Sequence, residues 1–294
     1  MNKAELLKEI KMTYYEMQEY LLQKYGTAIC DYFVTTECRS KSKKVGRTSE
    51  GLYCHHMDED KGGNLSNPPQ ARMQPFEWQK KERLVYCNAL EHLVLHMKIC
   101  ILRQNRKFKE PYDIDSFFTT GGVYMICHEI NDMFINDGTS VRWKKRCFEE
   151  FKENYTDYIQ IIKALVLYVE KSYKGEKSAD IFLKQGSYVH FSDCDCEILK
   201  LSPKKDAILL RLPNGDEKYF SSAVALNQLT YADNIDRNLR YMASGYDVFY
   251  EQIYNDLLKC QITDIIGEYS EAFHVDFSTE KFLWGSEAIN AIKK

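Results

Sequence analysis

Apolar residues recur at the spacing of an α-helix in several parts of the chain. The amino-terminal stretch presents one apolar face, formed by Leu6, Ile10, Tyr14, Met17 and Leu21. This spacing predicts a helix through roughly Gln23, which Asn2 and Glu5 open in a variant of the capping box. A second helix is predicted after Gly26, running into residues 39–47.

The rest of the chain combines helical spacing with shorter apolar runs. Residues 115–174 predict two or three helices, of which 157–173 is the most regular. Leu84 begins a short apolar strand or turn that passes into a helix ending near Ile101. Beyond Gly186 the pattern changes to short strands, with a hairpin-turn sequence at 213–216 before the last of them. These strands are predicted at 188–191, 197–201, 207–212 and 217–220.

The order of these elements predicts a predominantly helical α+β protein with a small β-containing carboxyl-terminal domain. We divide it into residues 1–110, a helical region at 111–184 and an α+β domain of unassigned role at 185–294. The 294 residues suit one large domain or two ordinary ones. A hydrophobic fraction of 44% with 28% charged residues is typical of globular proteins and excludes a disordered chain.

Apolar runs and cysteines bear on the cellular environment. No apolar run approaches the roughly 18 residues that a membrane span needs, and the chain opens on an amphipathic pattern rather than a signal peptide. We therefore expect neither a membrane protein nor a secreted one. The ten cysteines are scattered and form no Cys-x-x-Cys pair. This indicates reduced thiols in a cytoplasmic protein rather than disulfides or a four-cysteine zinc site.

The net charge of −3 conceals local basic runs. Residues 39–47 carry five cations and no acid, and residues 103–109 and 142–146 carry four cations each. Clustered cations attract a phosphate backbone, but a run of charge is usually a solvated face. The basic runs alone therefore leave nucleic-acid binding open.

Four of the seven histidines fall within 42 residues: His55, His56, His92 and His96. A spacing of four on a helix places His92 and His96 on one face, where they can chelate one divalent ion. His55, in an extended segment, is a candidate third ligand that leaves positions open for water or phosphate. Neighbouring strand residues point to opposite faces, so His56 is a candidate to take a proton from water near pH 7.

This constellation resembles the His-Asn-His (HNH) endonucleases of the ββα-metal superfamily. The similar segments are Leu52-Tyr-Cys-His-His56 and Leu84-Val-Tyr-Cys-Asn-Ala-Leu-Glu-His-Leu-Val-Leu-His96. The resemblance covers residues 48–104 and implies an HNH-like ββα-metal core set within helices. It also implies three metal ligands and a general base, the ligands being His55, His92 and His96 and the base His56.

The middle residue of the motif differs from the family pattern. Arg83 stands where the family has its Asn, so the orienting role passes to Asn88, or to Asn64 or Asn67 in the loop. Arg83 itself is either a phosphate clamp or an ion-pair partner of Glu82 or Glu91. We therefore take Arg83 and Asn88 as candidate catalytic residues beside His56.

The resemblance implies a metal-dependent DNA endonuclease of phage, restriction or defence biology. Mg²⁺ is the expected ion, with Zn²⁺, Mn²⁺ and Ni²⁺ as alternatives that three imidazoles hold more tightly. Double-stranded DNA is the expected partner, and a double-strand cut would favour a homodimer. The residues expected to contact DNA are Arg39, Lys41, Lys43, Lys44, Arg47 and Arg72.

A second hypothesis is a non-catalytic module that binds nucleic acid or protein and keeps the metal for structure. It predicts a closed shell of four ligands, with Cys54 or Cys87 as the fourth. The presence of His56 argues against it, because a purely structural site needs no base.

Overall fold

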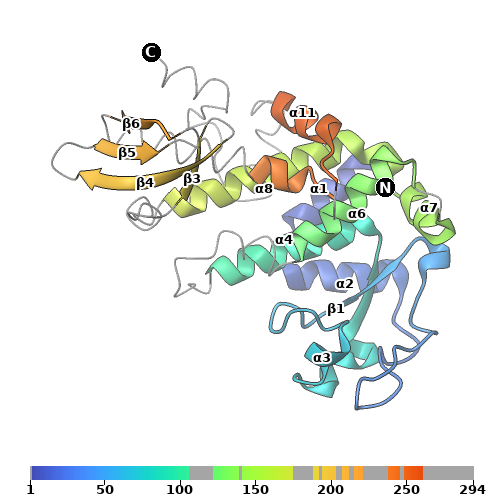
Figure 1. The fold of residues 1–294 in the computed structure, drawn as a ribbon. Helices are drawn as coiled ribbons and strands as arrows, with labels where there is room; N and C mark the ends of the chain where they lie inside the picture. The colour runs from blue at the N-terminus through green and yellow to red at the C-terminus, as the bar shows by residue number, and fades with distance from the viewer. Residues whose placement is uncertain are drawn as a thin grey trace.

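The computed structural model shows an α+β protein that is mostly helical (Figure 1). The residues that it describes are 2–105, 122–138, 141–174, 188–191, 194–202, 207–211, 215–220, 238–245 and 248–260. None of the described helices combines the length and the apolar composition that crossing a bilayer requires. The cysteines among the described side chains carry free thiols.

The amino-terminal segment forms two helices, α1 (Lys3–Lys11) and α2 (Tyr14–Tyr25), so the single helix predicted there is wrong. Asn2 caps α1 as expected, by accepting a hydrogen bond from the backbone of Glu5. The break at Met12 has a local cause, since Thr13 and Glu16 form a complete capping box that starts α2. The buried ammonium of Lys98 donates to the carbonyls of Ile10, at 2.7 Å, and Met12, and so caps the end of α1.

The helix predicted after Gly26 is also wrong. Gly26 ends α2 with a positive φ of 77°, and residues 27–47 form turns and two isolated bridges, Phe33 to Lys41 and Arg47 to Leu52. Their apolar side chains fill a second, smaller core instead of one helix face. This core contains Ala28, Tyr32, Phe33, Cys38, Val45, Leu52, Ala71, Leu84 and Tyr86.

An antiparallel strand pair leads directly into a long helix. β1 (Tyr53–His56) pairs with β2 (Leu84–Cys87), with His55 opposite Val85. The connection between the strands contains α3 (Pro68–Ala71) and two short 3₁₀ helices, η2 (Phe76–Gln79) and η3 (Lys81–Arg83), and η1 (Thr48–Glu50) precedes β1. After one residue, Asn88, the chain enters α4 (Ala89–Asn105). The predicted change from strand to helix in this segment is confirmed.

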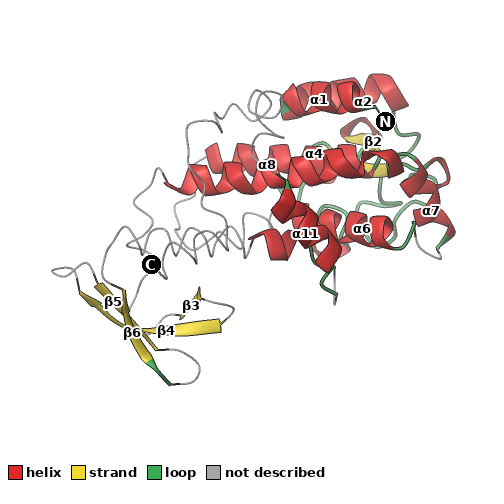
Figure 2. Cartoon of the chain, turned by 90° about the horizontal axis from the view of Figure 1, so that it is seen from above, coloured by secondary structure: helices red, strands yellow, loops and turns green. Residues whose placement is uncertain are grey.

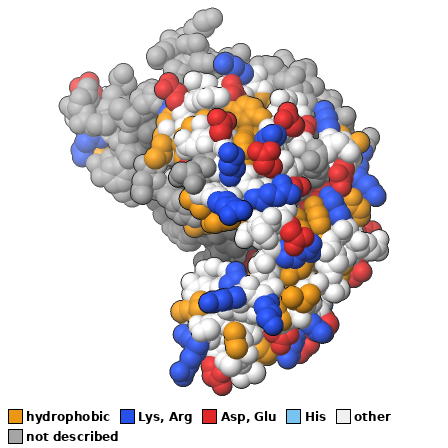
Figure 3. All heavy atoms as spheres, turned by 90° about the vertical axis from the view of Figure 1, so that its right-hand side faces the viewer, with side chains coloured by type: hydrophobic (Ala, Val, Ile, Leu, Met, Phe, Trp, Pro, Cys, Tyr) orange, Lys and Arg blue, Asp and Glu red, His pale blue; other side chains and the backbone are white. Residues whose placement is uncertain are grey.

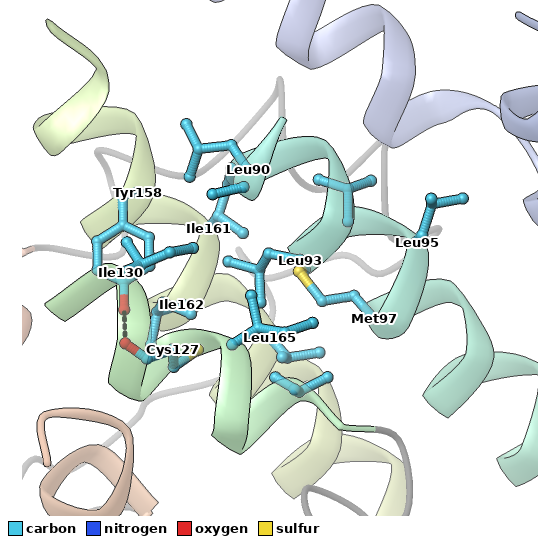
Figure 4. Packing of buried hydrophobic residues seen from close by; sticks show 14 of the residues in the cluster. Leu90, Leu93, Leu95, Met97, Cys127, Ile130, Tyr158, Ile161, Ile162 and Leu165 are labelled. Carbon is cyan, nitrogen blue, oxygen red and sulfur yellow. Dashed lines mark hydrogen bonds between the residues drawn. The ribbon is translucent and has the colours of Figure 1, made fainter. Parts of the chain in front are cut away.

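Four elements complete the helical body: α6 (Val123–Ile135), α7 (Arg142–Glu149), η4 (Lys152–Asn154) and α8 (Tyr155–Lys174). The predicted helix at 157–173 is therefore confirmed. The apolar faces of α4, α6 and α8 meet in the main core (Figure 4). That core also takes up Leu6, Met17 and Leu21 from the first two helices.

The predicted strands beyond Gly186 are confirmed. β3 (Tyr188–Phe191), β4 (Cys194–Ser202), β5 (Ala207–Arg211) and β6 (Glu217–Phe220) form an antiparallel sheet in sequence order (Figure 2). Gly215, in the predicted hairpin turn, has a positive φ of 87°. The predicted boundary near 184 lies outside the described residues.

Residues 238–260 pack with α6 and α8, although they follow the sheet in sequence. Residues 238–242 are helical, and α11 (Glu251–Lys259) comes next. Leu239, Met242 and Leu257 are buried in the main core. The carboxyl end of α11 is capped by Lys163 of α8, whose ammonium donates to the Leu257 carbonyl at 2.6 Å.

One buried amide joins these parts. Asn131 of α6 donates to the carbonyls of Met242, at 2.7 Å, and Ser244, at 2.9 Å. Its oxygen accepts from the Tyr158 hydroxyl of α8 at 2.6 Å. A buried polar group is stabilising only while its partners are in place, so this residue ties residues 238–245 to the helical body.

We expect Asn131→Ala to lower the free energy of unfolding by about 3 kcal/mol, because three buried groups would lose their partner. Asn136→Ala, at the exposed end of the same helix, should change it by about 0.5 kcal/mol or less. Urea unfolding followed by circular dichroism measures both. Equal effects of the two substitutions would show that the buried amide has no special role.

Candidate metal centre

The structure brings together three histidines from two elements. His55 comes from β1, and His92 and His96 come from consecutive turns of α4. One ring nitrogen of each lies within 4.8 Å of the others, and the Nε2 atoms of His92 and His96 are 3.1 Å apart. The imidazoles therefore converge on one point, as a shared metal ion requires.

The hydrogen bonds of His55 leave one nitrogen directed at this point. The Tyr14 hydroxyl donates to the Met57 carbonyl at 3.2 Å and lies 2.9 Å from His55 Nε2. With the hydroxyl proton directed at Met57, Nε2 carries the hydrogen and Nδ1 keeps its lone pair, which is the tautomer that a metal ion on Nδ1 requires. His55 Nδ1 is buried and has no hydrogen-bond partner among the described residues. A divalent ion bound by the three imidazoles would satisfy this atom, so the residues present fit a metal.

Burial favours the neutral form of His55 and His92. Burial, together with the neighbouring imidazoles of His96 and His92, lowers the pKa of His55 well below its usual range. Burial and the imidazole of His96 also lower the pKa of His92. Neutral imidazole is the form that binds metal ions, so His55 and His92 are in the ligating form at pH 7.

Glu59 lies beside the cluster, and sequence reasoning missed it. Its Oε2 is 3.3 Å from His96 Nε2 and 3.8 Å from His55 Nδ1, and its Oε1 is 3.8 Å from His56 Nδ1. The side chain is 12% exposed. Its position in the turn just after β1, four residues after His55, was the feature of the sequence that could have indicated it.

His56 lies on the other face of β1. Its Nε2 is 2.9 Å from the Gln79 amide oxygen, and its ring is tilted against Tyr32, with centroids 4.3 Å apart. The Gln79 amide nitrogen donates to the Leu65 carbonyl at 3.2 Å, so the amide oxygen faces His56. Burial lowers the pKa of His56 to about 4. His56 is therefore neutral at pH 7, with the hydrogen on Nε2 and the lone pair on Nδ1.

Arg83 and Asn88 have defined structural contacts. Arg83 forms two hydrogen bonds of 2.7 Å with the carboxylate of Asp58, so its ion-pair partner is neither Glu82 nor Glu91. Asn88 caps α4 in a reciprocal capping box with Glu91, which is fully buried. The contacts of Arg83 hold the loop after β1, and those of Asn88 hold the start of α4.

The other candidates are not among the converging ligand atoms. Asn64 and Asn67 are exposed in the loop. Cys54 and Cys87 are not in the metal-binding group found among the described residues.

The predicted DNA-contacting residues lie on the amino-terminal half. Five are exposed: Arg39, Lys41, Lys43, Lys44 and Arg72. The exposed Lys41 has its ammonium 4.4 Å from the Tyr32 ring centroid, next to His56. Arg47 is half-buried and is paired with Glu50 at 2.6 Å. On the face seen in Figure 3, cationic and acidic side chains are interspersed.

No protein-family model, curated protein or solved structure matches the chain. The functional assignment therefore rests on the residues and their geometry.

Gly122 closes one side of the cluster. It has a positive φ of 74°, and a Cβ on it would lie 2.8 Å from His96 Nδ1. We expect Gly122→Ala to displace the His96 ring and weaken Zn²⁺ binding about tenfold or more, as loss of support for a metal ligand does.

The matched control is Gly26→Ala. Gly26 has a similar φ of 77°, and a methyl group at this position would have nothing within 4 Å. Both substitutions place a Cβ at a positive φ and should destabilise the fold by about 1–3 kcal/mol through backbone strain, but Gly26→Ala should leave Zn²⁺ affinity unchanged. Calorimetric titration measures the affinities, and equal affinities of the two variants would contradict the proposed contact.

Proposed function

We propose that this protein is a metal-dependent endonuclease that hydrolyses phosphodiester bonds in DNA. The observation that carries the proposal is the convergence of His55, His92 and His96 directly beside His56, with a buried nitrogen that lacks a hydrogen-bond partner among the described residues. The order β1, β2, α4 agrees with the ββα-metal core that the sequence resemblance implies.

The three imidazoles would hold a divalent ion. Such an ion stabilises the negative charge that develops on the phosphate and on the departing oxygen. An all-imidazole set favours Zn²⁺, Mn²⁺ or Ni²⁺ in affinity, whereas Mg²⁺ prefers oxygen donors. The Tyr14 hydroxyl holds the ring of His55 in position for this role.

His56 would act as the general base. Because Gln79 fixes the hydrogen on Nε2, the atom that accepts a proton from water is Nδ1. The carboxylate of Glu59, 3.8 Å from Nδ1, would then stabilise the imidazolium. Gln79 is a positioning residue in this scheme, since it acts through His56.

Exposed cations near the site would position the DNA. Lys41 lies on the His56 side of the hairpin, and Arg39, Lys43 and Lys44 share its loop. Their contacts would be to phosphates, which give affinity and register without reading sequence. We propose double-stranded DNA as the substrate; a cut through both strands would favour a homodimer.

A second candidate function is a non-catalytic binding module with a structural metal. The burial of His56 against Gln79 and Tyr32 favours it, because a hydrogen-bonded buried histidine is explained by packing alone. The two functions differ in whether His56 matters to a reaction.

We expect His56→Ala to reduce the rate of supercoiled-plasmid cleavage by about 100-fold or more, the usual contribution of a general base. Cleavage by the wild-type protein should depend on Mg²⁺, Mn²⁺ or Zn²⁺ and stop with EDTA. His128→Ala, which removes a buried histidine of α6 outside the site, should keep most of the activity. Metal content and circular dichroism verify that each variant is folded.

Two outcomes would contradict this assignment. Equal cleavage by the wild-type and His56→Ala proteins would remove His56 as the base. An intact plasmid with stoichiometric metal in the wild-type protein would favour the structural function instead.

A further inference from the structure

Three consecutive acids, Asp58, Glu59 and Asp60, follow β1, and they have different surroundings. Asp58 is neutralised by Arg83, at 2.7 Å, and by Lys61, at 2.6 Å. Asp60 accepts a hydrogen bond of 2.9 Å from the Tyr15 hydroxyl. Glu59 is the one of the three whose carboxylate faces the histidines.

The distances around Glu59 are those of groups that share an ion. Donor atoms bound to one metal at about 2.0–2.2 Å lie roughly 3.2–4.4 Å apart, depending on the angle between the bonds. Glu59 Oε2 is 3.3 Å from His96 Nε2 and 3.8 Å from His55 Nδ1. One position can therefore lie within bonding distance of both nitrogens and of this oxygen. Glu59 is not in the group whose ligand atoms all lie within 4.8 Å of one another, so its side chain would have to turn toward His92 to share one ion with all three imidazoles.

The backbone of Glu59 is held on both sides. The Met57 N–H donates to the Arg83 carbonyl at 2.9 Å, and the Glu59 N–H donates to the His56 carbonyl at 3.2 Å. The pair between Asp58 and Arg83 anchors the residue that precedes Glu59. The carboxylate is therefore directed to the cluster by the fold of the turn, as a metal ligand needs to be.

We propose that Glu59 is the fourth protein ligand of the metal, which makes the site a three-imidazole, one-carboxylate centre selective for Zn²⁺ and similar ions over Mg²⁺. This inference rests on the metal site of the proposed function. Four protein donors suit the tetrahedral preference of Zn²⁺, whereas Mg²⁺ keeps several waters and prefers oxygen ligands. Four protein ligands close the shell, as the structural candidate function expects, so the nuclease function would require Glu59 to give up its position to a phosphate.

Co²⁺ and Zn²⁺ titration of the full-length protein tests this inference without any reaction. Co²⁺ reports coordination through its visible absorption, which is more intense in four-coordinate tetrahedral sites than in six-coordinate ones. The variants are Glu59→Gln, which replaces the carboxylate by an amide of the same shape, and Glu77→Gln, at an exposed acid in the same connection between the strands.

We expect Glu59→Gln to weaken Zn²⁺ binding by about 10–100-fold and to change the Co²⁺ spectrum, with Glu77→Gln matching the wild type in both. Mg²⁺ in large excess should not displace Co²⁺ from the wild-type protein. Weaker binding with an unchanged Co²⁺ spectrum would make Glu59 an orienting residue and overturn the proposal, as would unchanged affinity.

The failures of the two proposals are distinguishable. A wild-type protein that binds neither ion would overturn the metal site together with the role of Glu59. Tight binding that depends on Glu59 but gives no DNA cleavage would support the ligand and contradict only the nuclease function.

Discussion

The reciprocal hydrogen bonds between Asn88 and Glu91 determine the direction in which α4 leaves the strand pair. Only one residue separates β2 from α4, so the angle of the helix depends on this capping box, whose two bonds measure 2.6 and 3.0 Å. Glu91 also accepts hydrogen bonds from Lys24 and Tyr25 of α2. Strand, helix and neighbouring helix are thus joined at one buried carboxylate, and the positions of His92 and His96 follow from it.

The strand pair and α4 hold the three histidines in place before any ion is present. Burial disfavours the charged imidazolium, and the mutual proximity of the rings adds to that effect in lowering the pKa of His55. Tyr14 assigns the hydrogen of His55 to the nitrogen that faces away from the cluster. The free energy needed to assemble the site comes from the fold, so an ion meets ligands that are already oriented, with His55 and His92 in their neutral form.

The parts of the site that depend on local spacing could be predicted from the sequence. The spacing of His92 and His96 places them one helical turn apart, and alternation along a strand separates His55 from His56. Residues that reach the site through tertiary packing were not found in this way. Tyr14 appeared only as part of an apolar helix face, and Gln79 had no pattern to mark it.

The wrong helix predictions have a similar physical origin. Apolar residues after Gly26 suggested a helix, but they form a small core through turns, which leaves no periodic trace. The division of α1 from α2 was marked locally by Thr13 and Glu16, a capping box inside an otherwise helical pattern. The four-stranded sheet was predictable because its turns and alternating strands are themselves local features.

The most direct test of the preassembled site is a crystal structure of the Zn²⁺-loaded protein with anomalous data at the zinc edge. We predict one strong peak about 2.0–2.2 Å from His55 Nδ1, from Nε2 of His92 and His96, and from a carboxylate oxygen of Glu59, with α4 and β1 in their present positions. A peak elsewhere, or zinc bound only after α4 has moved away from β1, would contradict the claim that the fold assembles the site in advance.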